Sequence, residues 1–121
     1  MFAPFFIKEY QEIMQKTFTI LKPDTVKARN AGAIIDCLEK EGFTVRAMKM
    51  LHLTKSQAEG FYHVHKERPF FGDLVKFMTE GPVVMMVLEA DDAINKLRRV
   101  MGATDPAKAD AGTIRKRFGS N

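Results

Sequence analysis

The apolar run from Val83 to Leu88 (VVMMVL) limits most strongly how this chain can fold. A run of this kind is typical of a strand that is covered on both faces, so we expect helices to pack against the sheet that contains it. The chain has 121 residues, of which 45% are hydrophobic and 28% charged. That composition provides enough apolar surface for a single core, and no repeat, low-complexity tract or Gly/Ser linker divides the sequence. We therefore expect one compact domain.

Local signals place the boundaries of the other elements. Proline lacks an amide proton and favours extended geometry at the residue before it, so Pro23 should end the first strand at Lys22. Thr54, with Gln57 three residues on, matches a capping box that opens a helix. The expected elements are a strand at 18–21, a helix at 31–41, a strand at 43–53, a helix from 54 that Pro69 breaks, a helix at 73–79, the strand at 83–88, a helix from Asp91 or Asp92 to Gly102, a loop at 103–112 and a helical turn at 113–118.

The order of these elements predicts an α/β fold, an α+β sandwich with helices packed on a sheet. A ferredoxin-like β-α-β-β-α-β core with an antiparallel sheet would need one more strand at the end, which this chain does not supply. We take residues 1–16 as an N-terminal extension and residues 17–121 as the domain. Helical spacing predicts core-facing side chains at Ile34, Ile35 and Leu38, at Ala58, Phe61 and Tyr62, and at Ala93, Ile94, Leu97 and Val100.

Charge and cysteine content limit the partners and the compartment. The net charge of +4 and the pI of about 9.3 favour an anionic partner without choosing among nucleotides, nucleic acid and acidic lipid. The apolar stretch at Met1–Ile7 has no basic leader and is broken by Pro4, so it predicts neither a signal peptide nor a membrane span. Cys37 is the lone cysteine and excludes an intrachain disulfide. We expect a buried, inert thiol and a cytoplasmic protein.

Several donors and one aromatic side chain stand at the ends of predicted elements. Lys22 follows a strand, where it is either a solvated surface lysine or a phosphate ligand at the carboxyl end of a sheet. Phe70 and Phe71 are adjacent and cannot both face one core. One of them is therefore expected to be exposed, either as a platform that stacks on a base or as an edge of the core.

Two further groups of residues carry the same ambiguity. Arg98 and Arg99 close a helix, where a cation offsets the helix dipole but also suits bidentate contact with phosphate. The loop that follows contains Thr104 and leads to Arg115, and a loop of this length in a small domain is more often functional than idle. No sequence rule shows that these side chains meet in space.

The three histidines do not form a recognisable metal site. His52 lies in the second predicted strand, and His63 and His65 lie in the capped helix at a spacing that differs from the i, i+4 zinc pair. Phosphate-binding loops of the types GxxxxGK[ST] and GxGxxG are absent, as are GxSxG and HExxH. We therefore predict no metal ligands on the protein itself.

Several segments together resemble nucleoside diphosphate kinases in their order and spacing. A resemblance spread over Thr17 to Phe118 is far more specific than any single motif. The matching segments are Thr17–Asp24 (TFTILKPD), Arg68–Phe71 (RPFF), Leu74–Met78 (LVKFM), Gly81–Val84 (GPVV), Gly102–Pro106 (GATDP) and Gly112–Arg115 (GTIR).

The resemblance implies a role for each matching residue. Lys22 and Tyr62 would lie beside the reacting phosphate, and Phe70 would stack on the base. Nucleotide binding would also involve Leu74, Arg98, Thr104 and Arg115. Mg²⁺ would bridge the phosphates of the nucleotide itself, and a histidine would carry the γ-phosphoryl group of ATP to a nucleoside diphosphate in a ping-pong reaction.

The same resemblance defines what the printed sequence lacks. The family's nucleophile belongs to an Asn-x-x-His-Gly-Ser-Asp motif beyond GTIR, whereas the sequence ends at Gly119-Ser120-Asn121. The alternative to an active kinase is therefore a truncated nucleotide-binding domain that does not catalyse transfer. The family also implies a homo-oligomer, tetrameric or hexameric, with ATP and nucleoside diphosphates as partners and neither membrane nor nucleic acid. A nucleic-acid-binding domain is a third reading, and it would show binding that falls steeply with salt.

Overall fold

The computed structural model describes residues 14–102 and 106–118, and within them the strands form one antiparallel sheet. The strands are β1 (Met14–Leu21), β2 (Thr44–His52) and β3 (Pro82–Asp91), in the order β1-β3-β2. β3 contains the apolar run and pairs antiparallel with both neighbours, so β1 and β2 run in the same direction on either side of it. This is the split β-α-β arrangement of a ferredoxin-like fold, which confirms the predicted fold class.

The helices follow the predicted order. Thr54 and Gln57 form the capping box in full, because the Thr54 hydroxyl accepts from the Gln57 amide at 3.1 Å and the Gln57 side chain accepts from the Thr54 amide at 2.9 Å. The short helix that begins at Pro23 and the two 3₁₀ turns were not predicted from the sequence. The helical elements are α2 (Pro23–Lys27), α3 (Ala31–Lys40), α4 (Lys55–Phe61), η1 (His63–His65), α5 (Phe71–Met78), α6 (Ala93–Met101), η2 (Pro106–Lys108) and α7 (Ile114–Phe118).

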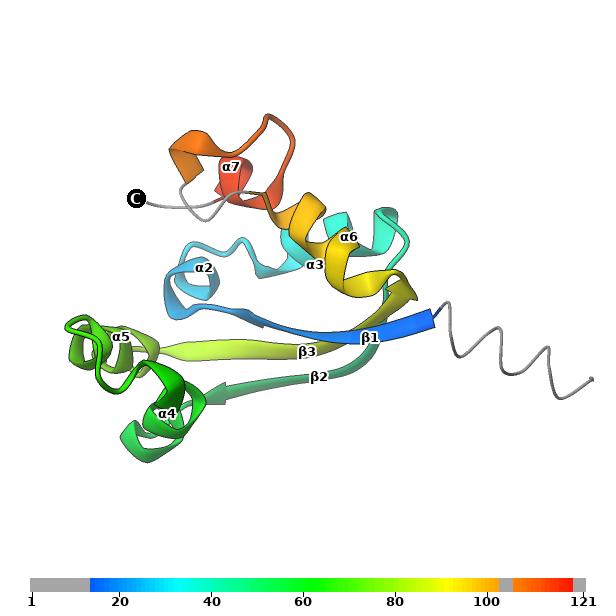
Figure 1. Cartoon of the computed structure of the whole chain (residues 1–121). Coiled ribbons are helices and arrows are strands. Elements are labelled where there is room, and N and C mark those ends of the chain that lie inside the picture. Colours follow the sequence, from blue (N-terminus) through cyan, green and yellow to red (C-terminus); the bar gives the residue numbers. More distant parts are fainter. Residues whose placement is uncertain (1–13, 103–105, 119–121) are drawn as a thin grey trace, which may run out of the picture.

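The helices gather in two places (Figure 1): α2, α3, α6 and α7 lie on one side of the sheet, and α4 and α5 lie at one end of it. The first core lies under the larger group, where Leu38 and Leu88 are fully buried. The second core lies at the end of the sheet, where Val83 packs with Ala58 and Met78. Because side chains alternate along β3, residues 84, 86, 88 and 90 face the first core while 83 and 85 face the second.

Three predictions about burial are wrong. The central strand is not fully covered on both faces, since Met85 and Val87 remain partly exposed. Phe61 was expected in the core but is 46% exposed, because only Ala58 of its helix is fully buried against the second core. Ile94 is also 46% exposed, since it lies about 100° around α6 from the buried Ala93.

The structure also corrects the expected burial of Cys37 and the expected positions of His63 and His65. Cys37 is half-buried rather than buried, packs against the first core and accepts a long contact of 3.8 Å from Arg117 Nη1. His63 and His65 lie in the η1 turn rather than in the capped helix, because α4 ends at Phe61. His52 lies on β2 as predicted.

Candidate functional site

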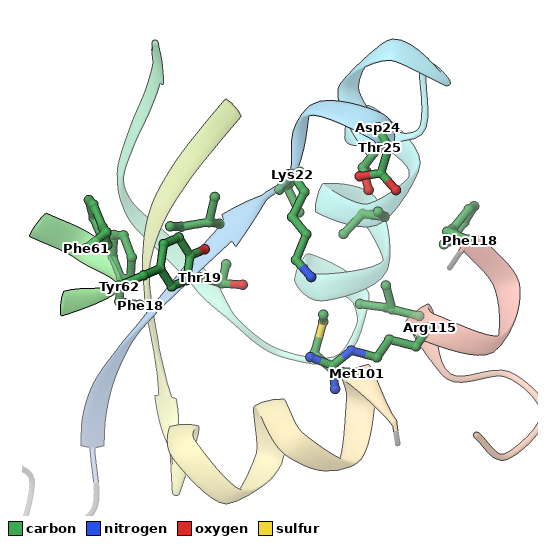
Figure 2. A pocket seen from close by; sticks show the side chains of 14 residues that line it. Phe18, Thr19, Lys22, Asp24, Thr25, Phe61, Tyr62, Met101, Arg115 and Phe118 are labelled. Atoms are coloured by element: carbon green, nitrogen blue, oxygen red, sulfur yellow. The ribbon is translucent and has the colours of Figure 1, made fainter. Parts of the chain in front are cut away.

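A pocket of about 410 Å³ follows the outer edge of β1 at its carboxyl end (Figure 2). Consecutive residues from Phe18 to Lys22 line it, and since neighbouring side chains on a strand point to opposite faces, the pocket must wrap around the edge of the strand. Helices α2, α3, α4 and α7, the last residue of α6 and the residue that follows α4 complete the wall. The lining residues are Phe18, Thr19, Ile20, Leu21, Lys22, Asp24, Thr25, Ile34, Phe61, Tyr62, Met101, Ile114, Arg115 and Phe118.

Lys22 is placed by the proline that follows it. It has extended geometry, with φ of −73° and ψ of 164°, and serves as the N-cap of α2, in which Pro23 takes the first position. Proline is preorganised for that position because its missing amide would have no partner inside the helix. The chain therefore turns sharply at Lys22, and the exposed ammonium group extends into the pocket (Figure 2).

Arg115 reaches the same pocket from α7. Its Nη1 donates to the carbonyl oxygen of Gly102 at 2.9 Å, which ties the partly buried guanidinium to the end of α6. Gly102 is required there because its φ is +83° and a Cβ would lie 2.6 Å from Thr113 Oγ1. Figure 2 shows the Arg115 and Lys22 side chains turned toward the same opening.

Tyr62 lines the pocket on the side of β1 that faces the second core. It is the C-cap of α4, where its amide donates to the Ala58 carbonyl at 3.1 Å, and its ring packs partly against the second core. Half-burial of the ring removes water from the phenol, and this desolvation raises the pKa of Tyr62 above its ordinary value of 10.0. The hydroxyl of Tyr62 points into the pocket (Figure 2).

The other residues named by the resemblance do not line this pocket. Phe70 is 48% exposed at the N-cap of α5, with its ring 5.5 Å from that of His65, so the expected exposed aromatic of the Phe70–Phe71 pair is Phe70. Leu74 packs against the second core. Arg98 is exposed in the last turn of α6, three residues before Met101 of the pocket wall. Thr104 lies outside the described residues.

Several lining residues were not singled out from the sequence. Asp24 and Thr25 come directly after Lys22 and Pro23, so the strand-ending motif itself was a signal for them. Phe18 and Phe61 were not candidates because periodicity treats a large apolar side chain as part of the core. Only the tertiary structure places them on the pocket wall.

Within residues 14–102 and 106–118, no three His, Cys, Asp or Glu side chains gather in a way that would hold a metal ion. All three histidines belong to this described part, and none of them lines the pocket. His52 instead makes a 2.6 Å hydrogen bond through its Nε2 to the Thr79 carbonyl oxygen. None of the described helices has the length and apolar character needed to cross a bilayer.

Comparison with known proteins gives a consistent result. The sequence profile of the nucleoside diphosphate kinase family matches residues 15–121. A nucleoside diphosphate kinase of Anaeromyxobacter sp. (strain Fw109-5) is 61% identical over 107 residues, which cover 88% of this chain and 73% of that protein.

Solved structures agree with the sequence match. The Aquifex aeolicus nucleoside diphosphate kinase superposes with a TM-score of 0.86 at 43% identity, over 89% of this chain and 79% of that one. The Halobacterium salinarum enzyme, solved in complex with CDP, superposes with a TM-score of 0.85 at 39% identity, over 88% and 70% of the two chains. With a family profile that spans the sheet, the helices and the pocket, and with relatives this similar, the chain belongs to the nucleoside diphosphate kinase family of phosphotransferases.

Proposed function

We propose that this nucleoside diphosphate kinase holds the phosphate chain of its nucleotide in the pocket at the edge of β1. The observation that supports this most directly is the convergence of Lys22 and Arg115, which come from opposite ends of the described chain, on one opening. During phosphoryl transfer, negative charge spreads over the oxygens of the transferred group, so catalysis depends on positioning and on fixed positive charge. Lys22 supplies a point charge, and Arg115 a planar donor that matches phosphate.

Tyr62 completes the proposed phosphate site. A phenol is protonated at neutral pH, and burial raises the pKa of Tyr62 further, so its hydroxyl is a hydrogen-bond donor toward a phosphate oxygen rather than a second negative charge. Together, Lys22, Tyr62 and Arg115 would hold the reacting phosphate beside the strand edge. We assign these three residues to the terminal phosphate of the bound nucleotide, which ADP presents as well as ATP.

The remaining residues are proposed to bind the nucleotide from the rim of the site. Phe70 offers a half-exposed ring, and stacking on such a ring accepts every base because every base has a π-face. Leu74 lies one helical turn after Phe70, and we propose that its side chain contacts the base next to the Phe70 ring. Arg98 lies on the turn of α6 that leads to Met101 in the pocket wall, and we propose that Arg98 and Thr104 contact phosphate from that side.

Mg²⁺ is the proposed cofactor, and the donor set of the pocket fits an ion that arrives on the nucleotide. Mg²⁺ keeps several waters and is usually held by one or two carboxylates together with substrate phosphates. The pocket contains one carboxylate, Asp24, beside the Thr25 hydroxyl, and two cations that would compete with a protein-held metal. When bound, Mg²⁺ would neutralise charge on the phosphates, while Lys22 and Arg115 hold the oxygens that the ion leaves uncovered.

We propose a phosphohistidine intermediate for the transfer, and we assign no part in it to His52, His63 or His65, which lie away from the pocket. Mass spectrometry of the chain after incubation with ATP tests this. A stable gain of one phosphoryl group on one of these three histidines would contradict the assignment. The expected result is that none of these three histidines carries a phosphoryl group.

Three further properties are proposed on the basis of family membership. The protein is a homo-oligomer, tetrameric or hexameric, it acts in the cytoplasm, and an N-terminal extension precedes its domain. Because β1 begins at Met14, that extension would be shorter than residues 1–16. Light scattering coupled to gel filtration measures the first of these directly. A monomer at micromolar concentration would contradict it.

Calorimetric titration with ADP tests the phosphate site. Lys22→Ala and Arg115→Ala should each weaken binding by roughly 1–3 kcal/mol through loss of a charge-assisted contact. Phe70→Ala should weaken it by a similar amount through loss of stacking, roughly 1–3 kcal/mol. Lys116→Ala is the matched control, because Lys116 follows Arg115 on α7, has the same charge and does not line the pocket. The site assignment fails if Lys22→Ala, Arg115→Ala and Phe70→Ala all bind ADP like the parent, or if Lys116→Ala loses as much affinity as Arg115→Ala.

A further inference from the structure

Two phenylalanine rings stack on the pocket wall without belonging to either core. Phe18 of β1 and Phe61 of α4 have ring centroids 5.8 Å apart and an angle of 18° between their planes. Their exposed fractions are 47% and 46%, so each ring keeps about half of its surface in water. Both rings line the pocket beside the phosphate site, where they contact each other rather than a buried core cluster.

The stack joins the two elements that carry residues of the phosphate site. Phe18 precedes Lys22 by four residues on β1, and Phe61 is the direct neighbour of Tyr62 at the end of α4. The ring of Phe61 also lies 6.4 Å from that of Tyr62, in a tilted arrangement. Any movement of Phe61 away from Phe18 would therefore carry Tyr62 away from the strand that leads to Lys22.

Helix α4 needs support at its carboxyl end. It has 7 residues, and a helix this short is not stable without tertiary contacts. The capping box of Thr54 and Gln57 holds its amino end, and Ala58 buries its middle. At the other end, Tyr62 departs from helical geometry, with φ of −105° and ψ of 21°, and helix ends of this kind fray unless something holds them.

We propose that the Phe18–Phe61 stack is a positioning device, which holds the carboxyl end of α4 against β1 and so keeps the Tyr62 hydroxyl in the phosphate pocket. Phe18 and Phe61 are positioning residues, since they act through Tyr62 and not on the nucleotide. The proposal rests on the proposed function only in assigning Tyr62 to the phosphate site. The ring contacts that couple Phe61 to Phe18 and to Tyr62 do not depend on any ligand.

The test uses the Tyr62 phenol as its own reporter. The sequence has 2 tyrosines, so a Tyr10→Phe background leaves Tyr62 as the one phenol that titrates in ultraviolet difference spectra. In that background, Phe61→Ala should lower the pKa of Tyr62 toward its ordinary value, because the ring gains water. ADP binding should weaken roughly three- to tenfold, in line with the contribution of an aromatic pair.

Two comparison variants separate stacking from a general loss of apolar surface. Phe61→Trp keeps a flat ring in a chain that otherwise has no tryptophan, and it should preserve both the Tyr62 titration and ADP affinity. Ile94→Ala removes an apolar side chain of the same 46% exposure from α6 and should change neither. Should Phe61→Ala lose its circular dichroism, Phe61→Leu, which keeps apolar bulk without a ring, has the same two expected effects.

Three results would overturn the proposal. One is a folded Phe61→Ala protein whose Tyr62 titration and ADP affinity equal those of the parent. Another is a Phe61→Trp protein as perturbed as Phe61→Ala, and the third is an Ile94→Ala protein that changes both readouts equally. Failure of the phosphate site itself looks different: Arg115→Ala would then bind ADP normally, while the Tyr62 titration would still report on the stack.

Discussion

The two faces of the sheet differ in how they are covered, although they share one central strand. On the face toward α3, α6 and α7, Met86 and Leu88 of β3 are almost completely buried. On the other face, Val83 is buried under α4 and α5 at one end, but Met85 and Val87 are only partly covered and line a shallow groove with Phe18. The first face therefore provides most of the dry core, and the second is covered mainly at the end nearest the phosphate pocket.

This difference explains where the pocket lies. The pocket wraps around the edge of β1, so its wall takes Leu21 and Ile34 from the covered side and Phe18 and Phe61 from the open side. The covered side gives a rigid base for Lys22 and Arg115. The open side presents the stacked rings of Phe18 and Phe61, each of which is about half exposed.

The largest expected effect compares neighbours on β3 that face opposite ways. Leu88→Ala should lower the free energy of unfolding by about 2–5 kcal/mol, because Leu88 is 0% exposed and its removal leaves a cavity. Val87→Ala, one residue away on the open face, should cost about 1 kcal/mol or less, since part of the side chain is already in water. Urea denaturation measures both. Equal losses would show that the two faces contribute alike.

A charged pair on the open face gives the next effect. Glu89 is 8% exposed, and its Oε1 accepts from Arg46 Nε at 3.0 Å and from Nη2 at 2.7 Å. Arg46→Ala should cost about 1–3 kcal/mol, because it leaves a largely buried carboxylate with fewer donors. The double variant Arg46→Ala/Glu89→Ala should be less unstable than Arg46→Ala alone.

The exposed pair of Lys40 and Asp36 serves as the control for that prediction. Its side chains are 75% and 61% exposed, and surface pairs of this kind contribute little. Lys40→Ala should therefore leave the urea midpoint unchanged. A loss as large as that of Arg46→Ala would mean that burial of Glu89 does not explain the effect.

The third prediction concerns the rim of the pocket. Arg98→Ala should weaken ADP binding by about 1 kcal/mol, less than Arg115→Ala, because Arg98 is exposed whereas Arg115 is anchored to Gly102. Arg99→Ala is the control, since its side chain lies about 100° around α6 from that of Arg98. Equal affinities in the Arg98 and Arg99 variants would remove Arg98 from the site.

The smallest effect is a pH dependence of stability. Burial raises the folded-state pKa of Tyr62 above 10.0, so its stabilising contribution is complete below the unfolded pKa and is lost as the pH rises through the folded value. We expect the thermal midpoint of the parent to fall more steeply above pH 10 than that of Tyr62→Phe. Because the ring is only partly buried, the difference should be small. Parallel curves for the two proteins would contradict the prediction.

The sequence predicted much of the fold through signals that act within a few residues. Pro23 marked the end of the first strand, whose last residue is Leu21, the capping box opened α4, and the apolar run marked the central strand. Of the phosphate site, the resemblance supplied Lys22, Tyr62 and Arg115, whose assembly in one pocket could not be read from spacing alone. The predicted inward positions of Phe61 and Ile94 were wrong, because helical periodicity cannot tell how much of an apolar stripe its partner covers.

The sequence by itself determined where elements begin and end and which residues have the chemistry to bind phosphate, because proline, capping side chains and apolar periodicity act locally. The tertiary structure alone decided which face of the sheet stays open, which cations share a pocket and which rings stack beside it. These features depend on where α4 and α7 pack relative to β1, across separations of about 40 to 100 residues. Contacts over such distances arise from packing of the whole core, and no local pattern encodes them.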